Sequence, residues 1–266
     1  MYHHRIRPAW RIGGRVHLRP GGTNMPDTLK INAPQVKLIA HRGVSGLERE
    51  NTASAFVAAG NRSYYGIETD VHRTADGKFI IIHDDSTKRV CGDNLIVEES
   101  RFDTLRRLQV QDMRGGYGRA DLVLPSLQEY AGICRYYDKV SVLELKNHFE
   151  REDIEKIIGI VADEQQLENT VFISFDLPNM ITLRDLLPGQ KLQYLTRGCD
   201  QEILDILTRY QLDIDVKYPA VTQEMVDELH SRGIVINCWT VNDPADAERL
   251  AGYGVDFITT NILEQA

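Results

Sequence analysis

The sequence predicts an α/β fold, a (β/α)8 or TIM barrel, over residues 35–266. After Pro34, short β-rich runs alternate with amphipathic helical runs, which is the pattern of parallel strands joined by helical crossovers. About eight such units fit into roughly 230 residues, a ratio typical of a closed barrel rather than an open sheet. Polar side chains also follow several of the strands at the same end.

Nine runs have the composition of strands. They are Val36–His41, Gly66–Val71, Phe79–His83, Val140–Leu145, Val171–Ser174, Lys191–Leu195, Leu212–Val216, Ile234–Trp239 and Val255–Thr259. Because a barrel of this class has eight strands, one of these runs is marginal or lies outside it. The segment Val71–Lys78 is too short to hold a crossover helix, so we expect the barrel to be irregular near its second and third strands.

Helical runs separate most of these strands, and clear examples are Thr52–Asn61, Arg151–Glu164 and Thr222–Ser231. The longest stretch without a strong strand covers residues 84–125 and contains a helical run near Ser100–Leu108. A connection of this length is usually functional. We therefore expect residues 84–125 to form an insertion over one mouth of the barrel, either a lid or a part that shapes the substrate site.

The first 34 residues are expected to form a basic, disordered tail. Residues 1–30 hold five arginines and one lysine against a single acid, Asp27, and glycines and prolines interrupt any helix. No apolar core follows the charges, so the segment does not have the pattern of a secretory signal. Met25 stands just before the entry into the first strand, and we expect it to be the true start.

The formal net charge is -8 and the four cysteines are widely spaced. An acidic chain does not suit nucleic acid as a general partner, whereas a small phosphorylated substrate needs positive charge at only one site. No CxxC pair or zinc spacing occurs, so we expect free thiols and a cytoplasmic location. No apolar run is long enough for stable membrane insertion. The sequence does not determine the oligomeric state, and a homo-oligomer is possible.

Chemically active side chains gather at the ends of the predicted strands, where barrel enzymes build their active sites. Glu68 and Asp70 are two residues apart and share one strand face, and Glu144 and Lys146 repeat that arrangement. Three converging carboxylates repel one another unless a cation lies among them. Because oxygen ligands suit hard cations, we predict one Ca²⁺ or Mg²⁺ at Glu68, Asp70 and Glu144.

Two histidines and two basic side chains are expected beside this cation. His41 and His83 end the first and third runs, and such a pair suits a general acid and base. Arg42 and Lys146 add positive charge for a phosphate. Each feature also has a plain structural explanation, since a lone histidine at a strand end is usually structural. Their recurrence at four successive strand ends favours a hydrolase or lyase that cleaves phosphodiesters.

A series of short motifs follows in a fixed order along the chain. They are His41-Arg42-Gly43, Glu50-Asn51-Thr52 with Ala55-Phe56, Glu68-Thr69-Asp70-Val71, Thr74-Ala75-Asp76-Gly77, His83-Asp84, Leu124-Pro125-Ser126-Leu127, Glu144-Leu145-Lys146, Trp239-Thr240-Val241-Asn242 and Gly254–Thr259. This ordered set resembles the glycerophosphodiester phosphodiesterase family, within the phospholipase C-like phosphodiesterase superfamily, over residues 36–263. Each motif is short, but the order of the set is specific.

The resemblance implies a barrel that hydrolyses glycerophosphodiesters to sn-glycerol 3-phosphate and an alcohol. It implies roles for Glu68, Asp70 and Glu144 as cation ligands, His41 and His83 as acid and base, Arg42 and Lys146 as phosphate contacts, and Trp239 as a surface for the glycerol group. Glu50 would bind the cation or hold a residue beside it. The implied reaction starts with attack by a hydroxyl of the substrate itself and gives a cyclic phosphate that water then opens. Which histidine acts first as base stays open.

Two positions depart from the usual family pattern. Arg49 stands where proline is common, and Asn261 stands where an acid is common. These changes leave the expected chemistry intact and bear on substrate preference. One alternative is a lysophospholipase D or another phospholipase C-like phosphodiesterase, which should have an exposed apolar rim that the fairly polar insertion does not predict. The second is a non-catalytic binding barrel, although such proteins usually lose a histidine or a cation-binding acid.

Overall fold

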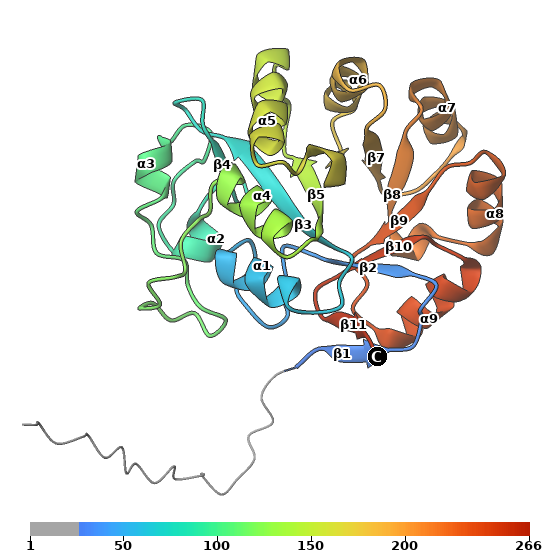
Figure 1. Cartoon of the computed structure of the whole chain (residues 1–266), viewed down its shortest axis with the longest axis horizontal. Helices are drawn as coiled ribbons and strands as arrows, with labels where there is room; N and C mark the ends of the chain where they lie inside the picture. The colour runs from blue at the N-terminus through green and yellow to red at the C-terminus, as the bar shows by residue number, and fades with distance from the viewer. Residues whose placement is uncertain (1–26) are drawn as a thin grey trace, which may run out of the picture.

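The computed structural model describes residues 27–266. Eight parallel strands in this part of the chain close into a barrel, with β10 pairing back to β2. In barrel order they are β2 (Lys37–Ala40), β3 (Gly66–Arg73), β5 (Val140–Leu145), β6 (Thr170–Ser174), β7 (Lys191–Thr196), β8 (Asp213–Lys217), β9 (Ile236–Trp239) and β10 (Phe257–Thr260). The predicted TIM barrel is confirmed, and Figure 1 shows its strands surrounded by helices.

The helices cover the outside of the barrel. They are α1 (Ala53–Gly60), α4 (Leu127–Tyr136), α5 (Arg151–Asp163), α6 (Leu177–Leu186), α7 (Gln201–Tyr210), α8 (Gln223–Ser231) and α9 (Pro244–Tyr253). Ser126 and Glu129 form a capping box that starts α4. The main apolar core lies between the helices and the outer strand faces, and a smaller cluster fills the barrel interior.

The run Phe79–Ile81 is strand β4, and it lies outside the barrel as expected for one of the nine runs. It pairs antiparallel with the far end of β3, from Val71 opposite Ile81 to Arg73 opposite Phe79. β3 therefore extends past its parallel pairing, and a short turn brings the chain back toward the barrel mouth. His83 thus reaches the mouth on a returning hairpin and not at the end of a barrel strand, which corrects the prediction.

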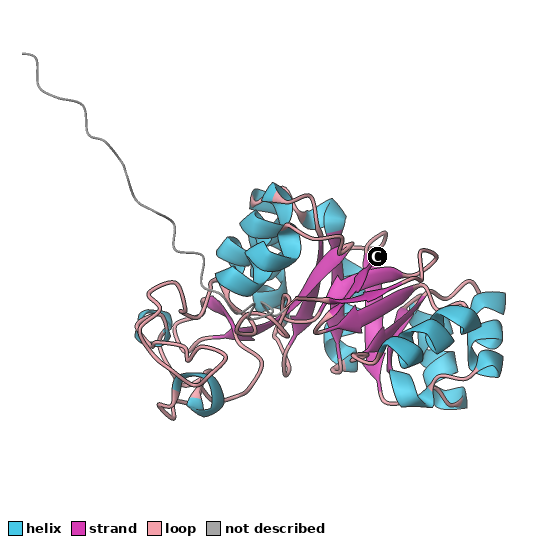
Figure 2. Cartoon of the chain, turned by 90° about the horizontal axis from the view of Figure 1, so that it is seen from below, coloured by secondary structure: helices cyan, strands magenta, loops and turns pink. Residues whose placement is uncertain are grey.

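Residues 84–125 form a small unit beside the barrel, composed mostly of loops (Figure 2). It contains two short helices, α2 (Lys88–Cys91) and α3 (Phe102–Leu105), so the helix near Ser100–Leu108 is shorter than predicted. The unit has its own apolar cluster, formed with β4 by Ile80, Ile82, Val90, Cys91, Val97, Leu105, Val110, Leu122 and Leu124. This second core fixes the insertion to the hairpin that carries His83.

The cysteines agree with the free-thiol prediction, since Cys91, Cys134, Cys199 and Cys238 form no disulfide in the described chain. Within residues 27–266, no helix combines the length and the apolarity needed to cross a membrane.

The boundary predicted at residue 34 is wrong for the described part of the tail, while residues 1–26, including Met25, lie outside the described residues. Strand β1 (Leu29–Ile31) pairs in parallel with β11 (Leu263–Gln265) at the other end of the sequence. Glu264 joins the two ends, because its carboxylate accepts from Thr28 and Ser63 and pairs with Lys30 Nζ at 2.7 Å. These contacts hold residues 28–31 against the far end of the sequence.

Glu264 provides a test of this closure. Burial tends to raise its pKa, but Lys30, Thr28 and Ser63 outweigh that effect and lower the pKa to about 2. A carboxyl whose pKa is lower in the folded state stabilises the fold above its unfolded pKa, and this contribution is lost as pH falls toward 2. We expect Glu264→Gln to lower the free energy of unfolding at pH 7 by about 1–3 kcal/mol.

Urea unfolding at pH 7, 5 and 3 measures this difference, which should shrink below about pH 5. The control is Glu168→Gln, an exposed acid in a short turn of 3-10 helix. An equal loss in both variants, or a Glu264→Gln loss that is the same at every pH, would show that the ion pair does not join the two ends.

Candidate active site

A tight turn after β2 presents His41 and Arg42 to the barrel mouth. Arg42 and Gly43 both have positive φ, of 55° and 77°. This conformation is strained for arginine, and a contact compensates for it, because the Arg42 backbone N–H donates to Glu68 Oε2 at 2.8 Å. Gly43 is required because a Cβ there would lie 2.6 Å from Ala55. The glycine of the His-Arg-Gly motif is therefore a structural requirement of this turn.

The three predicted cation ligands converge. Glu68 and Asp70 point to the same side of β3, and the β3–β5 register places Glu144 directly opposite Asp70. One oxygen atom from each carboxylate lies within 4.8 Å of the others. Glu144, the most exposed of the three, is only 8% exposed. The predicted convergence of these acids is confirmed.

The electrostatics of this group fit a divalent cation. Burial raises the pKa of Glu68 well above its ordinary value and that of Glu144 to about 8, and the charge of Asp70 adds to both shifts. Burial would also raise the pKa of Asp70, but Arg42 and Lys146 lower it. Asp70 Oδ1 is buried and accepts no hydrogen bond from the described residues. A hard cation among these oxygens would offset their crowded negative charge and displace the retained protons, so the group could hold one.

His41 and His83 both lie at this mouth, and each is held through Nδ1. His41 Nδ1 is 2.6 Å from Asn261 Oδ1, and its Nε2 is 3.9 Å from Glu68 Oε2. Because the amide oxygen accepts, the proton lies on Nδ1 and Nε2 is free to accept another. Burial lowers the pKa of His41 to about 4, and the charge of Arg42 contributes, so the ring is neutral at pH 7.

A carboxylate, not an amide, holds the second histidine. His83 Nδ1 lies 2.7 Å from Asp84 Oδ1. Burial lowers the pKa of His83, while Asp70 and Asp84 act in the opposite direction. The two rings therefore differ in their partners, because His83 pairs with a negatively charged carboxylate and His41 with a neutral amide oxygen.

The two predicted phosphate contacts are paired with acids of the site. Arg42 donates from Nη1 to Glu50 Oε1 at 2.9 Å, and its Nε lies 3.4 Å from Asp70 Oδ2. Lys146 Nζ lies 2.9 Å from Glu144 Oε1. Glu50 is not a member of the acidic group that could hold a metal. Its contact with Arg42 fits the second of its two expected roles, that of holding a residue beside the cation.

Arg89, in the insertion, is a site residue that the motifs missed. Its guanidinium donates to both oxygens of Glu50 at 2.8 Å. It also donates to both oxygens of Asp84, at 2.7 and 3.0 Å. One side chain thus ties the acid that holds Arg42 to the acid that holds His83. A basic residue five positions after the His-Asp motif was the only signal in the sequence.

A single cavity contains most of these groups. It is lined by His41, Arg42, Glu68, His83, Glu144, Lys146, Ile173, Phe175, Leu195, Asp215, Trp239, Thr240 and Thr259. Trp239 lies on the wall opposite the acids, as β9 is far from β3 in the barrel order. The cavity lining includes no described residue of 84–125. The insertion contacts the site through Asp84, which holds His83, and through Arg89, which holds Glu50.

Comparisons with known proteins agree with this geometry. A family model described as "Glycerophosphoryl diester phosphodiesterase family" matches residues 41–265. YhdW of Bacillus subtilis (strain 168) is 31% identical over 236 residues, which cover 84% of this chain and 93% of that protein. A Bacillus altitudinis glycerophosphodiester phosphodiesterase is 29% identical over 237 residues, covering 86% and 96%.

A solved structure extends the likeness to the fold. An Oleispira antarctica phosphodiesterase, in complex with the product sn-glycerol-3-phosphate, has a TM-score of 0.79 and 23% identity to this chain. The match covers 86% of this chain and 94% of that one.

Proposed function

The chain belongs to the glycerophosphoryl diester phosphodiesterase family, and from this premise we propose that it hydrolyses glycerophosphodiesters to sn-glycerol 3-phosphate and an alcohol. The observation that carries the proposal is one cavity lined by His41, His83, Glu68 and Glu144. The Oleispira antarctica phosphodiesterase binds sn-glycerol-3-phosphate as its product, which is the product we expect here.

Glu68, Asp70 and Glu144 would hold one divalent cation, Ca²⁺ or Mg²⁺, which when bound neutralises negative charge on the phosphate oxygens. Arg42 and Lys146 line the cavity beside these acids and are proposed to contact the phosphate. Glu50 is proposed to orient Arg42, because it accepts a hydrogen bond from that side chain.

We assign the base of the first step to His41, because its ring is neutral and its Nε2 is free. His41 takes the proton from the glycerol hydroxyl next to the phosphate, whose oxygen then attacks phosphorus. The bond from phosphorus to the alcohol breaks, and His83, whose protonated form the charge of Asp84 favours, gives the departing oxygen a proton. The result is a cyclic phosphate and a free alcohol.

In the second step the two histidines exchange roles. His83, now neutral, takes a proton from water as the water oxygen attacks phosphorus, and the ring oxygen leaves. His41 returns its proton to that oxygen, which restores the glycerol hydroxyl. Both histidines recover their starting states, and no nucleophile of the protein is needed.

A coupled assay for glycerol 3-phosphate release tests the proposal. We expect release from glycerophosphocholine, glycerophosphoethanolamine or glycerophosphoinositol when Ca²⁺ or Mg²⁺ is present, and little choline release from lysophosphatidylcholine. Faster turnover of the lysolipid would instead support a lysophospholipase D. No release from any diester with either cation would support a non-catalytic binding barrel.

A further inference from the structure

One buried carboxyl group at the cavity has no part in the reaction steps above. Asp215 lies on the inner face of β8, is 2% exposed and lines the cavity. Its Oδ1 is buried and has no hydrogen-bond partner among residues 27–266. The neighbouring inward polar side chains are paired, since Thr259 donates to Asn237 Oδ1 at 3.1 Å and Asn237 donates to Gln193 at 3.2 Å. Compared with these three described neighbours, Asp215 alone has an unused oxygen.

An unpaired buried oxygen of this kind is costly. Leaving a buried acceptor unsatisfied destabilises a protein, because the oxygen loses its hydrogen bonds to water and gains none in the fold. Native proteins hold few such groups, and each calls for an explanation such as a ligand that pairs with it. Within the described chain, the cavity-lining side chains with an unpaired buried polar atom are Arg42 and Asp215. Arg42 already has two acidic partners, so the free position in the cavity belongs to Asp215.

The chemistry of Asp215 suits a hydroxyl group of a ligand. Burial raises its pKa well above the ordinary value, and the charge of Glu144 adds to the shift. A protonated carboxyl has one O–H donor and a carbonyl acceptor, and a hydroxyl can pair with both. A neutral acid also does not repel a phosphate bound nearby.

The barrel order indicates which part of the substrate meets Asp215. His41, Glu68 and Glu144 come from the neighbouring strands β2, β3 and β5, whereas Asp215 comes from β8 on the opposite wall. A phosphate bound on the side of His41, Glu68 and Glu144 therefore has one of its two organic groups pointing across the cavity toward Asp215.

The volumes of two adjoining spaces indicate where each of the two organic groups of the substrate lies. The cavity holds about 90 Å³. An open groove of about 450 Å³ adjoins it and shares Phe175 and Leu195 with it. The glycerol group is small and common to all these substrates, so we place it in the smaller cavity and the variable alcohol in the larger groove.

We propose that Asp215 is a specificity-determining residue whose carboxyl group hydrogen-bonds the terminal hydroxyl of the glycerol group, the hydroxyl that does not attack phosphorus. This inference rests on the proposed hydrolysis of glycerophosphodiesters. It gives the enzyme a means to recognise glycerol rather than any short diol, because an analogue without that hydroxyl would leave the buried carboxyl unpaired.

The test compares two substrates and three variants. The substrates are sn-glycero-3-phosphocholine and its analogue with hydrogen in place of the terminal hydroxyl, which keeps the attacking hydroxyl. Wild type should prefer the glycerol substrate in kcat/KM, measured by choline release, by on the order of 100-fold. Asp215→Leu should lose turnover of the glycerol substrate only, so its preference should fall to within about threefold. Asp215→Asn still forms hydrogen bonds and should keep most of the wild-type preference.

Stability gives an independent readout. Asp215→Leu should unfold at a higher temperature than wild type, because a leucine of similar shape removes an unsatisfied buried polar group. A purely structural carboxyl would give the opposite shift. The control is Asp213→Asn, earlier on the same strand, where Asp213 Oδ1 accepts from the Val235 N–H at 2.8 Å and not from a ligand. This variant should keep the wild-type preference.

The outcomes separate the two proposals. If wild type hydrolyses neither substrate, the proposed function fails and the role of Asp215 fails with it. If wild type hydrolyses both substrates equally, or if Asp215→Leu keeps the preference or loses stability, only the role of Asp215 is overturned.

Discussion

Replacement of either His41 or His83 by alanine is expected to lower kcat/KM by about 10²- to 10⁴-fold while the fold stays intact. The reason is chemical, since each ring moves one proton in each step and the cavity offers no second imidazole at either position. Circular dichroism and the thermal midpoint should remain close to those of wild type, because both rings lie at a cavity and not in the apolar core.

A second substrate separates the roles of the two histidines. A glycerophosphodiester of 4-nitrophenol has a leaving group that departs without a proton, so it needs no general acid in the first step. We expect His83→Ala to recover much of its loss in the first step with this ester and His41→Ala to recover none, measured as nitrophenolate release in a single turnover. Recovery in His41→Ala alone would reverse the two assignments.

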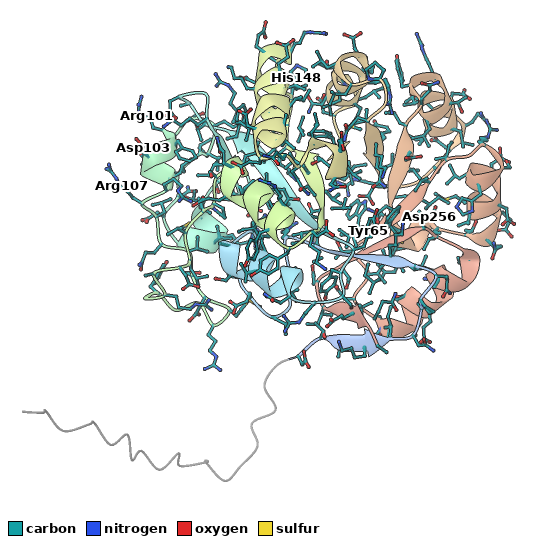
Figure 3. All side chains as sticks on the ribbon, viewed as in Figure 1. Tyr65, Arg101, Asp103, Arg107, His148 and Asp256 are labelled. Atoms are coloured by element: carbon teal, nitrogen blue, oxygen red, sulfur yellow. The ribbon has the colours of Figure 1, made fainter. Side chains whose placement is uncertain are left out.

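His230→Ala is the matched control for both variants. His230 is on α8, and its Nε2 pairs with Asp256 Oδ2 at 3.0 Å. Asp256, labelled in Figure 3, precedes β10 and so lies at the amino end of the strands, away from the cavity. Near-wild-type rates in either His41→Ala or His83→Ala would remove that ring from the reaction.

Local periodicity was enough to predict the acidic half of the site. Glu68 and Asp70 are two residues apart in one strand, and parallel strands bring their carboxyl ends together, so the convergence with Glu144 needs no knowledge of the exact pairing. The turn after β2 could be expected as well, because the glycine after His41-Arg42 marks a tight backbone position.

Residues recruited by long-range pairing could not be predicted in this way. The position of His83 depends on how far β3 extends past its parallel neighbours, and the sequence does not show that length. Asn261 meets His41 across 220 positions of the chain. The same limit explains the error at residues 27–34, where a basic segment looks like a free tail until β11 at the far end of the sequence pairs with it.

Removal of divalent cations is the second change for which we expect a large effect, with activity falling by at least about 100-fold and returning when Ca²⁺ or Mg²⁺ is added. Glu68→Gln, Asp70→Asn and Glu144→Gln should each weaken this recovery, because each removes one charged oxygen ligand from the group. Glu150→Gln is the control, since Glu150 is exposed and lies just before α5. Activity that does not respond to a chelator would exclude the cation from the reaction.

Stability shows whether the acids bind the cation directly. Without a cation, burial and the charge of Asp70 raise the pKa of Glu144 to about 8. At a pH between the ordinary pKa of a glutamate and about 8, the Glu144 carboxyl is ionised in the unfolded chain but protonated in the folded chain. The cation-free protein should therefore lose stability as pH rises from 5 to 8. A bound cation displaces this proton, and its stabilising effect should therefore grow over the same range.

Thermal unfolding at pH 6 and pH 8, with chelator or with added cation, measures both effects. Glu144→Gln keeps a neutral group at every pH, so its cation-free form should unfold several degrees above wild type at pH 8 and lose most of the increase that the cation gives. A cation that acted only on the substrate would leave both midpoints unchanged. A rise in the midpoint of wild type but not of Glu144→Gln therefore identifies this carboxylate as a ligand, even before a substrate is found.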